Sequence, residues 1–416
     1  MKIKLLFLLF LVSLPSFAQY TLIPDVNFEN KLIALRIDSG VADGKVLTSS
    51  INSLTYLNVS SSNITDLTGI QNFVSLIHLF CEENQLTTLD VSKNVALASL
   101  SCNSNQLTNL NLSNNPVLKD LLFDNNQLKN LDVSKNVALE NLFCRYNQLT
   151  NLDFSKNVAL QSLFCDFNQL TNLDISKNAD LSVLNCNSNQ LTALDVSKNI
   201  ALRSLSCDYN QLTNLDVSKN TTLKDLFCIA NQLTNLNVSK NTLLDLLNCS
   251  YNQLTSLDIS MNTNLNYLIC NSNRLANLNL KNGKNVNFGD THIDFTENLN
   301  LICIQVDDVD YSNLNWPNKK NFYATYSTSC SWLGISEAIF DKIAVYPNPT
   351  KEELYIDNII LEKATVYNVS GQLVRTFTLD SANTNNTINL SGLPKGVYFV
   401  YLINQDAASV KKVIVE

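Results

Sequence analysis

The chain has 416 residues, which is long enough for more than one domain, and only 16% of them are charged. The formal net charge of −8, with no basic cluster, argues against a nucleic-acid partner. The two histidines, His78 and His292, lie in different regions, and we find no nucleophile motif, metal-ligand spacing or glycine-rich phosphate loop. We therefore expect a protein that is not an enzyme and that binds no cofactor and no metal.

The first 18 residues have the pattern of an export signal peptide. Lysines precede an apolar run from Leu5 to Leu14, and small residues follow it, so we expect cleavage between Ala18 and Gln19. The alternative, an N-terminal membrane anchor, is disfavoured because the apolar run is too short. No other stretch is apolar enough to cross a bilayer, so we expect export through the inner membrane and no membrane span in the mature chain.

Residues 19–53 are predicted to cap the repeats that follow, because the first coil would otherwise expose its apolar edge to water. The pattern predicts a short amphipathic helix over residues 27–35. The segment 38–46 contains Asp43 and Gly44 but lacks the ligand spacing of a calcium loop, which favours a tight turn.

A cysteine recurs every 21 residues through the middle of the chain, and Phe123 replaces it once. The nine cysteines are Cys81, Cys102, Cys144, Cys165, Cys186, Cys207, Cys228, Cys249 and Cys270. An asparagine follows each of these positions by three residues, and a leucine follows by five. A fixed period of this length indicates a solenoid. We expect the cysteines to be buried free thiols, because stacked neighbours have parallel Cβ directions that suit a disulfide poorly.

The repeated unit resembles the leucine-rich repeat, and about 11 such units fill residues 54–282. One unit has the sequence Leu97-x-x-Leu100-x-Cys102-x-x-Asn105-x-Leu107. The resemblance implies a solenoid of 21-residue leucine-rich repeats, with a parallel β-sheet on its concave face and a mostly irregular convex side. An aspartate and a lysine also recur at this period, as at Asp132 and Lys135. We interpret them as solvated ladders for solubility and register, with calcium binding by the aspartates as an alternative.

The residues that the period does not fix carry the candidate binding site. In this repeat family, residues that flank the buried strand positions face the concave side, which is the usual binding surface. Aromatic and charged residues gather there, and the candidates are Phe143, Arg145, Tyr146, Phe164, Asp166, Phe167, Tyr209, Phe227 and Tyr251. A row of exposed aromatic side chains suggests recognition of a ligand. The alternative is that the rings only pack on one another and stabilise the sheet face.

After residue 282 the period falters, and residues 283–333 are predicted to form a C-terminal cap. We expect its last strand over residues 298–304 and a covering loop over residues 307–316. Cys303 and Cys330 are the only cysteine pair outside the period, which predicts a disulfide bond between them.

A linker is predicted over residues 334–341, and residues 342–416 then contain about seven short alternating runs that indicate a small antiparallel β-sandwich. This region resembles the type A sorting domain of the bacterial type IX secretion system. The residues that carry the resemblance include Tyr346, Pro347, Asn348, Pro349, Gly371, Gly396, Tyr398, Lys411 and Lys412. The resemblance implies that the secretion machinery moves the chain across the outer membrane of a Gram-negative bacterium, to the cell surface or into the medium.

The sequence therefore predicts an exported, non-enzymatic recognition or adhesion protein that binds a protein or a glycan through its concave face. The alternative is a structural surface or matrix protein, in which the solenoid is a rigid spacer that associates with itself.

Overall fold

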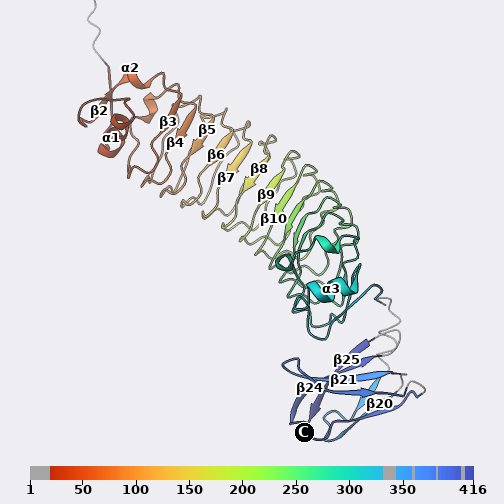
Figure 1. Cartoon of the computed structure of the whole chain (residues 1–416). Coiled ribbons are helices and arrows are strands. Elements are labelled where there is room, and N and C mark those ends of the chain that lie inside the picture. The colour runs from red at the N-terminus through yellow and green to blue at the C-terminus, as the bar shows by residue number, and fades with distance from the viewer. Residues whose placement is uncertain (1–18, 331–342, 358–360, 381–382, 404–407) are drawn as a thin grey trace, which may run out of the picture. The chain divides into compact units, whose positions relative to one another are not determined.

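The computed structural model describes residues 19–330, 343–357, 361–380, 383–403 and 408–416 (Figure 1). The predicted signal peptide and the predicted linker lie outside these residues. The chain divides into two compact units, the first ending at Asn178 and the second beginning at Ala179. We describe each unit by itself. No helix in the described ranges has the length and apolar character needed to cross a membrane.

The first unit begins with a small cap made of short elements. These are β1 (Tyr20–Leu22), α1 (Val26–Ala34), β2 (Lys45–Leu47) and α2 (Thr48–Ile51). The predicted helix is confirmed as α1, and Asp25 caps it by accepting hydrogen bonds from the backbone N–H groups of Asn27 and Phe28. The predicted turn is fixed by the buried Glu29 carboxylate, which accepts from the N–H groups of Asp43 and Gly44, both at 2.8 Å.

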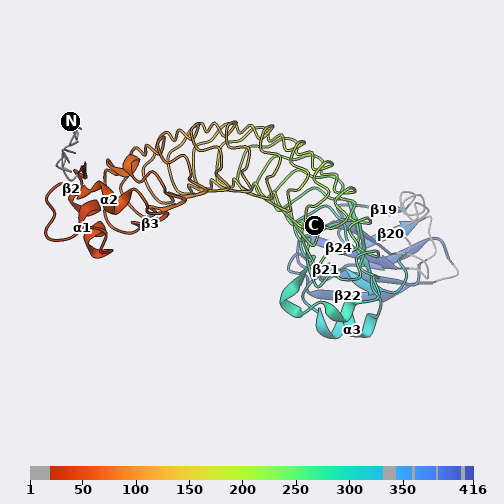
Figure 2. The same ribbon diagram turned by 90° about the horizontal axis from the view of Figure 1, so that it is seen from above.

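Both units contain coils of a parallel-strand solenoid, and each coil has a strand of two or three residues on the same side (Figures 1 and 2). In the first unit the strands are β3 (Tyr56–Asn58), β4 (His78–Phe80), β5 (Ser99–Ser101), β6 (Asp120–Leu122), β7 (Asn141–Phe143) and β8 (Ser162–Phe164), with the 3₁₀ helix η1 (Ile70–Asn72). In the second unit they are β9 (Val183–Asn185), β10 (Ser204–Ser206), β11 (Asp225–Phe227), β12 (Leu246–Asn248), β14 (Tyr267–Ile269) and β16 (Ile293–Asp294). Within each unit, strands follow one another in chain order.

An asparagine ladder runs along the ends of the strands, where each asparagine side chain forms hydrogen bonds with backbone groups of its own coil and of the preceding coil. The Asn126 side chain donates to the carbonyl oxygens of Cys102 and Phe123, both at 3.0 Å, and accepts from the N–H of Leu107 at 2.9 Å. A second ladder runs through the opposite side of the coils, where Asn136 donates to the carbonyl oxygens of two residues of the preceding coil. These side chains satisfy backbone groups that the turns would otherwise bury unpaired. The nine cysteines are buried free thiols, as predicted.

The second unit carries a further parallel sheet on the other side of its coils. Its strands are β13 (Ser256–Asp258), β15 (Asn277–Asn279), β17 (Cys303–Gln305) and β18 (Thr325–Ser327). The second unit also contains the short helices η2 (Asn285–Asn287), η3 (Asp290–His292) and α3 (Val309–Asn315). Two expectations for the cap were wrong. The strand expected last over 298–304 is shifted to β17 and is followed by β18, and the expected loop over 307–316 contains α3.

The helix α3 forms because Asp308 provides a cap, accepting from the N–H of Tyr311 at 2.9 Å. The predicted disulfide is present between Cys303 and Cys330, whose Cα atoms lie 6.0 Å apart. It ties the end of the cap to β17.

The C-terminal region is antiparallel, as predicted, and the described residues form seven strands there. They are β19 (Ala344–Tyr346), β20 (Glu353–Asp357), β21 (Lys363–Asn368), β22 (Leu373–Thr378), β23 (Asn386–Asn389), β24 (Gly396–Ile403) and β25 (Ala408–Val415). One sheet has the order β19-β20-β23 and the other β22-β21-β24-β25. Alternating residues such as Leu354, Val366 and Val400 form their common core.

Candidate binding surface

The sequence of each coil decides which side chains face outward. In β7, Leu142 is buried while Asn141 and Phe143 on either side of it are half-buried and point away from the core. Because β7 and β8 pair in register, Phe143 lies directly beside Phe164. We call the outward side of these strands, together with the turn residues that follow them, the strand face.

On the strand face, the turn after each strand from β4 to β12, and after β14, contains a residue in the left-handed conformation, with φ between 51° and 55°. These residues are Glu83, Ser104, Asn125, Tyr146, Phe167, Ser188, Tyr209, Ala230, Tyr251 and Ser272. Each costs roughly 1 kcal/mol relative to an ordinary conformation, because none of them is a glycine. The position therefore holds its side chain in a fixed outward direction on every coil.

The structure brings four of the predicted aromatic residues together as two stacked pairs, which we call the paired rings. The centroids of Phe143 and Phe164 lie 4.7 Å apart with 6° between the ring planes, and those of Tyr146 and Phe167 lie 4.3 Å apart with 8°. Tyr146 and Phe167 remain 48% and 44% exposed in spite of this contact. The rings thus pack on one another and still present a large apolar surface to solvent.

The charged residues beside the paired rings follow a pattern that the sequence did not reveal. Arg145 forms an ion pair with Asp124 of the preceding coil, and its Nε and Nη2 atoms lie 2.9 Å and 2.7 Å from Oδ2. The hydrogen bond with Asp124 raises the pKa of the Arg145 guanidinium. The guanidinium also lies 5.8 Å from the centroid of Phe164. The sequence analysis did not include Asp124 among the candidate residues. Its position 21 residues before Arg145, one repeat earlier, could have indicated that the two side chains lie side by side.

Asp166 is not the main partner of Arg145. It is only 5% exposed, and its buried Oδ1 atom has no hydrogen-bond partner in the described part of the chain. Burial raises the pKa of the Asp166 carboxyl to about 6. Asp208 occupies the same position in a coil of the second unit, and burial raises its pKa to about 6 as well.

The remaining aromatic candidates lie in the second unit. Tyr209 and Tyr251 are 61% and 58% exposed, but the coil between theirs carries Ala230 at the same position. Phe227 is half-buried at the end of β11. These three aromatic side chains therefore lie apart from one another on the strand face and do not form a further stacked pair.

A polar hollow of about 530 Å³ lies on the strand face of the first unit. Its lining residues are Asn58, Ser60, Ser61, Glu82, Glu83, Asn103, Ser104, Asp124, Asn125 and Arg145. Asn125 precedes Tyr146 by one coil in the same position, and Arg145 is next to Tyr146 in the chain. The hollow therefore extends along the coils as far as the paired rings.

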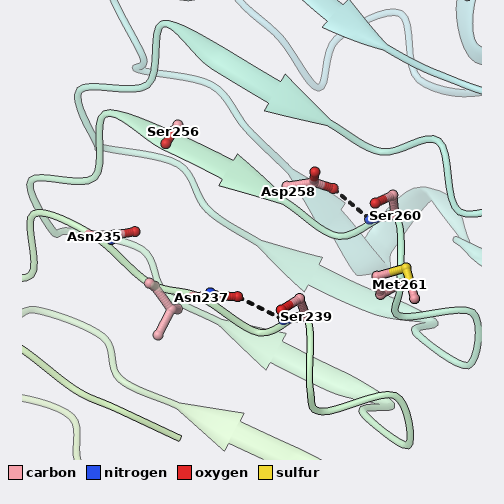
Figure 3. Close-up of a pocket in the computed structure, with 8 residues that line it drawn as sticks. Asn235, Asn237, Ser239, Ser256, Asp258, Ser260 and Met261 are labelled. Atoms are coloured by element: carbon pink, nitrogen blue, oxygen red, sulfur yellow. Dashed lines mark hydrogen bonds between the residues drawn. The ribbon is translucent and has the colours of Figure 1, made fainter. Parts of the chain in front are cut away.

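A second hollow, of about 320 Å³, lies on the opposite side of the coils in the second unit (Figure 3). Its side chains are engaged in turns: Asn237 accepts from the N–H of Ser239 at 3.0 Å, and Asp258 accepts from that of Ser260 at 2.8 Å. The predicted aspartate ladder has this same role, since the hydrogen bond from the Ser134 N–H lowers the pKa of Asp132. No group of three or more His, Cys, Asp or Glu side chains in the described ranges could hold a metal ion.

In the C-terminal region, Asn348 holds the last strand in place. Its amide donates to the carbonyl oxygen of Lys412 at 2.7 Å, and its Oδ1 accepts from the N–H of Ile414 at 2.9 Å. Tyr398 donates its hydroxyl to the carbonyl oxygen of Pro394 at 2.8 Å. Gly371 has a φ of 78° in the turn between β21 and β22.

Residues 344–416 match the family model described as "Secretion system C-terminal sorting domain". The functional domain of InlJ from Listeria monocytogenes, which includes a cysteine ladder, is 27% identical with a TM-score of 0.63, over 96% of this chain and 98% of that one. An internalin, InlF, from the same organism is 22% identical with a TM-score of 0.53, over 69% and 92%. No curated protein matches the chain at the level of sequence.

A third similar structure is the leucine-rich-repeat ectodomain of the plant membrane receptor kinase GASSHO1/SCHENGEN3 from Arabidopsis thaliana, in complex with CASPARIAN STRIP INTEGRITY FACTOR 2. It is 20% identical with a TM-score of 0.53, over 62% of this chain and 39% of that one. The predicted leucine-rich-repeat solenoid and the predicted type IX sorting domain are both confirmed. The chain is an exported leucine-rich-repeat protein, found at the cell surface or secreted, and no catalytic family is indicated.

Proposed function

We propose that this chain is a non-enzymatic recognition or adhesion protein that binds a protein or a glycan through its strand face, after the sorting domain has directed it across the outer membrane. The observation that carries the proposal is the exposure of Tyr146 and Phe167. Clustered aromatic side chains that remain in solvent on a folded surface are typical of binding hot spots. Each of them is also held in a costly backbone conformation, which favours a fixed surface over a flexible one.

The test is a binding screen of the mature chain, residues 19–416, against arrays of glycans and of extracellular proteins. The variant is Tyr146→Ala with Phe167→Ala, and alanine is compatible with this position because Ala230 already occupies it at a φ of 51°. We expect a hit that weakens about tenfold or more in the variant. The matched control is Val137→Ala with Val158→Ala, which removes two exposed apolar side chains on the opposite side of the coils in the first unit.

A screen without any hit, together with concentration-dependent self-association of the mature chain, would support the structural alternative instead. The export step has its own test. We expect the protein recovered from the cell surface or the medium to begin at Gln19, as N-terminal sequencing would reveal.

A further inference from the structure

The polar hollow carries an excess of negative charge. Its ionisable residues are Glu82, Glu83, Asp124 and Arg145, so three carboxylates face one guanidinium. Arg145 is held by Asp124 through two of its nitrogens, at 2.9 Å and 2.7 Å. The only cation of the hollow is therefore neutralised by its neighbour, and the charges of Glu82 and Glu83 remain uncompensated.

These two carboxylates also have unused capacity for hydrogen bonds. Glu82 accepts from the hydroxyl of Ser60, and Glu83 accepts from the hydroxyl of Ser61 at 2.7 Å. A carboxylate has about four acceptor positions, so each can accept further bonds from a ligand. A ligand that supplies donors and positive charge fits the hollow, whereas phosphate, sulfate or carboxylate groups are repelled by it.

The paired rings favour a protein over a glycan. Sugars stack their C–H faces on the flat face of an aromatic ring, but Tyr146 and Phe167 cover one face of each other at 4.3 Å. This stacking covers only the facing sides of the two rings and leaves their edges uncovered. Edges carry partial positive charge and pack well against apolar side chains and carbonyl oxygens, which a polypeptide offers at every residue.

The spacing between the two features fits an extended chain. Glu83 and Tyr146 occupy the same position three coils apart, which corresponds to about 14 Å at the spacing of paired strands. That distance equals about four residues of extended polypeptide. One segment can therefore reach both features without a bend.

We propose that the first unit binds an extended protein segment in which a lysine or arginine enters the polar hollow at Glu82 and Glu83. An apolar residue about four positions away packs against the edges of Tyr146 and Phe167. This inference rests on the proposed function and names the class of partner for the same surface.

The test uses the mature chain and synthetic nine-residue peptide libraries, with either lysine or glutamate fixed at one position and leucine or phenylalanine four positions away. A panel of neutral oligosaccharides is measured in parallel. The variant is Glu82→Gln with Glu83→Gln, which removes charge and keeps shape. The matched control is Asp132→Asn with Asp153→Asn, which removes the same charge from the first unit on its other side. Asparagine is accepted there, since Asn111 makes the same turn contact with Ser113 at 3.0 Å.

We expect the lysine library to bind, and its affinity to fall about tenfold in the glutamine variant and remain unchanged in the control. Raising the salt concentration should weaken the binding, because the charges lie at the surface. Binding that is lost on replacing Tyr146 and Phe167 but is unaffected by the glutamine variant would retain the proposed function and overturn this inference. Binding of the neutral oligosaccharides alone would overturn it in the same way. If no probe binds and neither the glycan array nor the protein array gives a hit, the proposed function itself fails.

Discussion

At the scale of single residues, the position that directly follows the cysteine position of each repeat contains both an ion-paired carboxylate and an unpaired one. We call the side chains at this position the charged column. Asp124 is bound to Arg145, whereas Asp166 is buried with an unbonded oxygen. Asn103 occupies the same position one coil earlier, and its Oδ1 accepts from the N–H of Asp124 at 2.7 Å, so an amide side chain can also be accommodated there. Asp166 therefore has an evident cost as a carboxylate, as Asp208 has at the same position in the second unit.

We predict that Asp166→Asn stabilises the first unit at neutral pH by about 1–3 kcal/mol. The folded chain holds this proton up to a pH of about 6, whereas an unfolded aspartate releases it near 4. The folded state thus binds more protons between these values, so stability falls as pH rises from about 4 to about 6. Urea unfolding of wild type and variant should converge at pH 4, and a gain of stability at both pH values would contradict the prediction.

The two asparagine ladders differ in how completely their side chains are bonded. Asn126 uses both its amide and its oxygen, while the buried Oδ1 of Asn136 has no partner in the part of the chain that the structure describes. We predict that Asn126→Ala costs about 3 kcal/mol and Asn136→Ala about half of that, because each unbonded backbone group has a desolvation cost. Equal losses of unfolding free energy in urea would contradict the prediction and show that the two ladders stabilise the fold equally.

At the scale of elements, the C-terminal cap is where the sequence pattern and the structure differ most. From β4 to β12, and on to β14, the strands on the strand face recur every 21 residues, and their boundaries follow from the pattern. The coils that contain β16 and β18 have other lengths, so the period could not place them. The helix α3 was missed because its signal is a single capping residue, Asp308, rather than a repeated apolar stripe.

The disulfide should matter most for this cap. We predict that replacing both Cys303 and Cys330 by alanine lowers the stability of the cap by about 3.5 kcal/mol, the loop-closure value for the 27-residue separation. Limited proteolysis should then cut first near α3. A reductant serves as the control. It should reproduce the loss in the wild type and have no further effect on the variant, because the ladder cysteines are already free thiols.

At the scale of the whole molecule, the sequence alone was sufficient for the solenoid, the sandwich and the disulfide, because each depends on spacing. The period also placed Phe143 beside Phe164 and Tyr146 beside Phe167 on adjacent coils, but left open whether the rings pack on one another, which the structure shows. It did not reveal the partner of Arg145 or the burial of Asp166. The ion pair and the burial depend on the side-chain conformations of Arg145 and Asp166, whereas the repeat period determines only where their backbones lie.

We predict that deletion of residues 344–416 leaves the solenoid folded but stops it on the inner side of the outer membrane. Fractionation of the producing cells would show this as loss of surface and medium signal. Asn348→Ala is a milder form of the test, since it removes the two hydrogen bonds that hold β25. Unchanged surface display of the deletion variant would mean that another segment directs sorting.

The 21-residue coils meet one another through the same asparagine bonds and the same buried leucines, whichever residues occupy the strand face. Duplication or loss of one 21-residue unit in the gene would therefore preserve the contacts of the core. It would, however, change the number of strands between the polar hollow and the paired rings by one. Gain or loss of a repeat would thus change the spacing of the proposed binding surface by one coil at a time, without any change in the core.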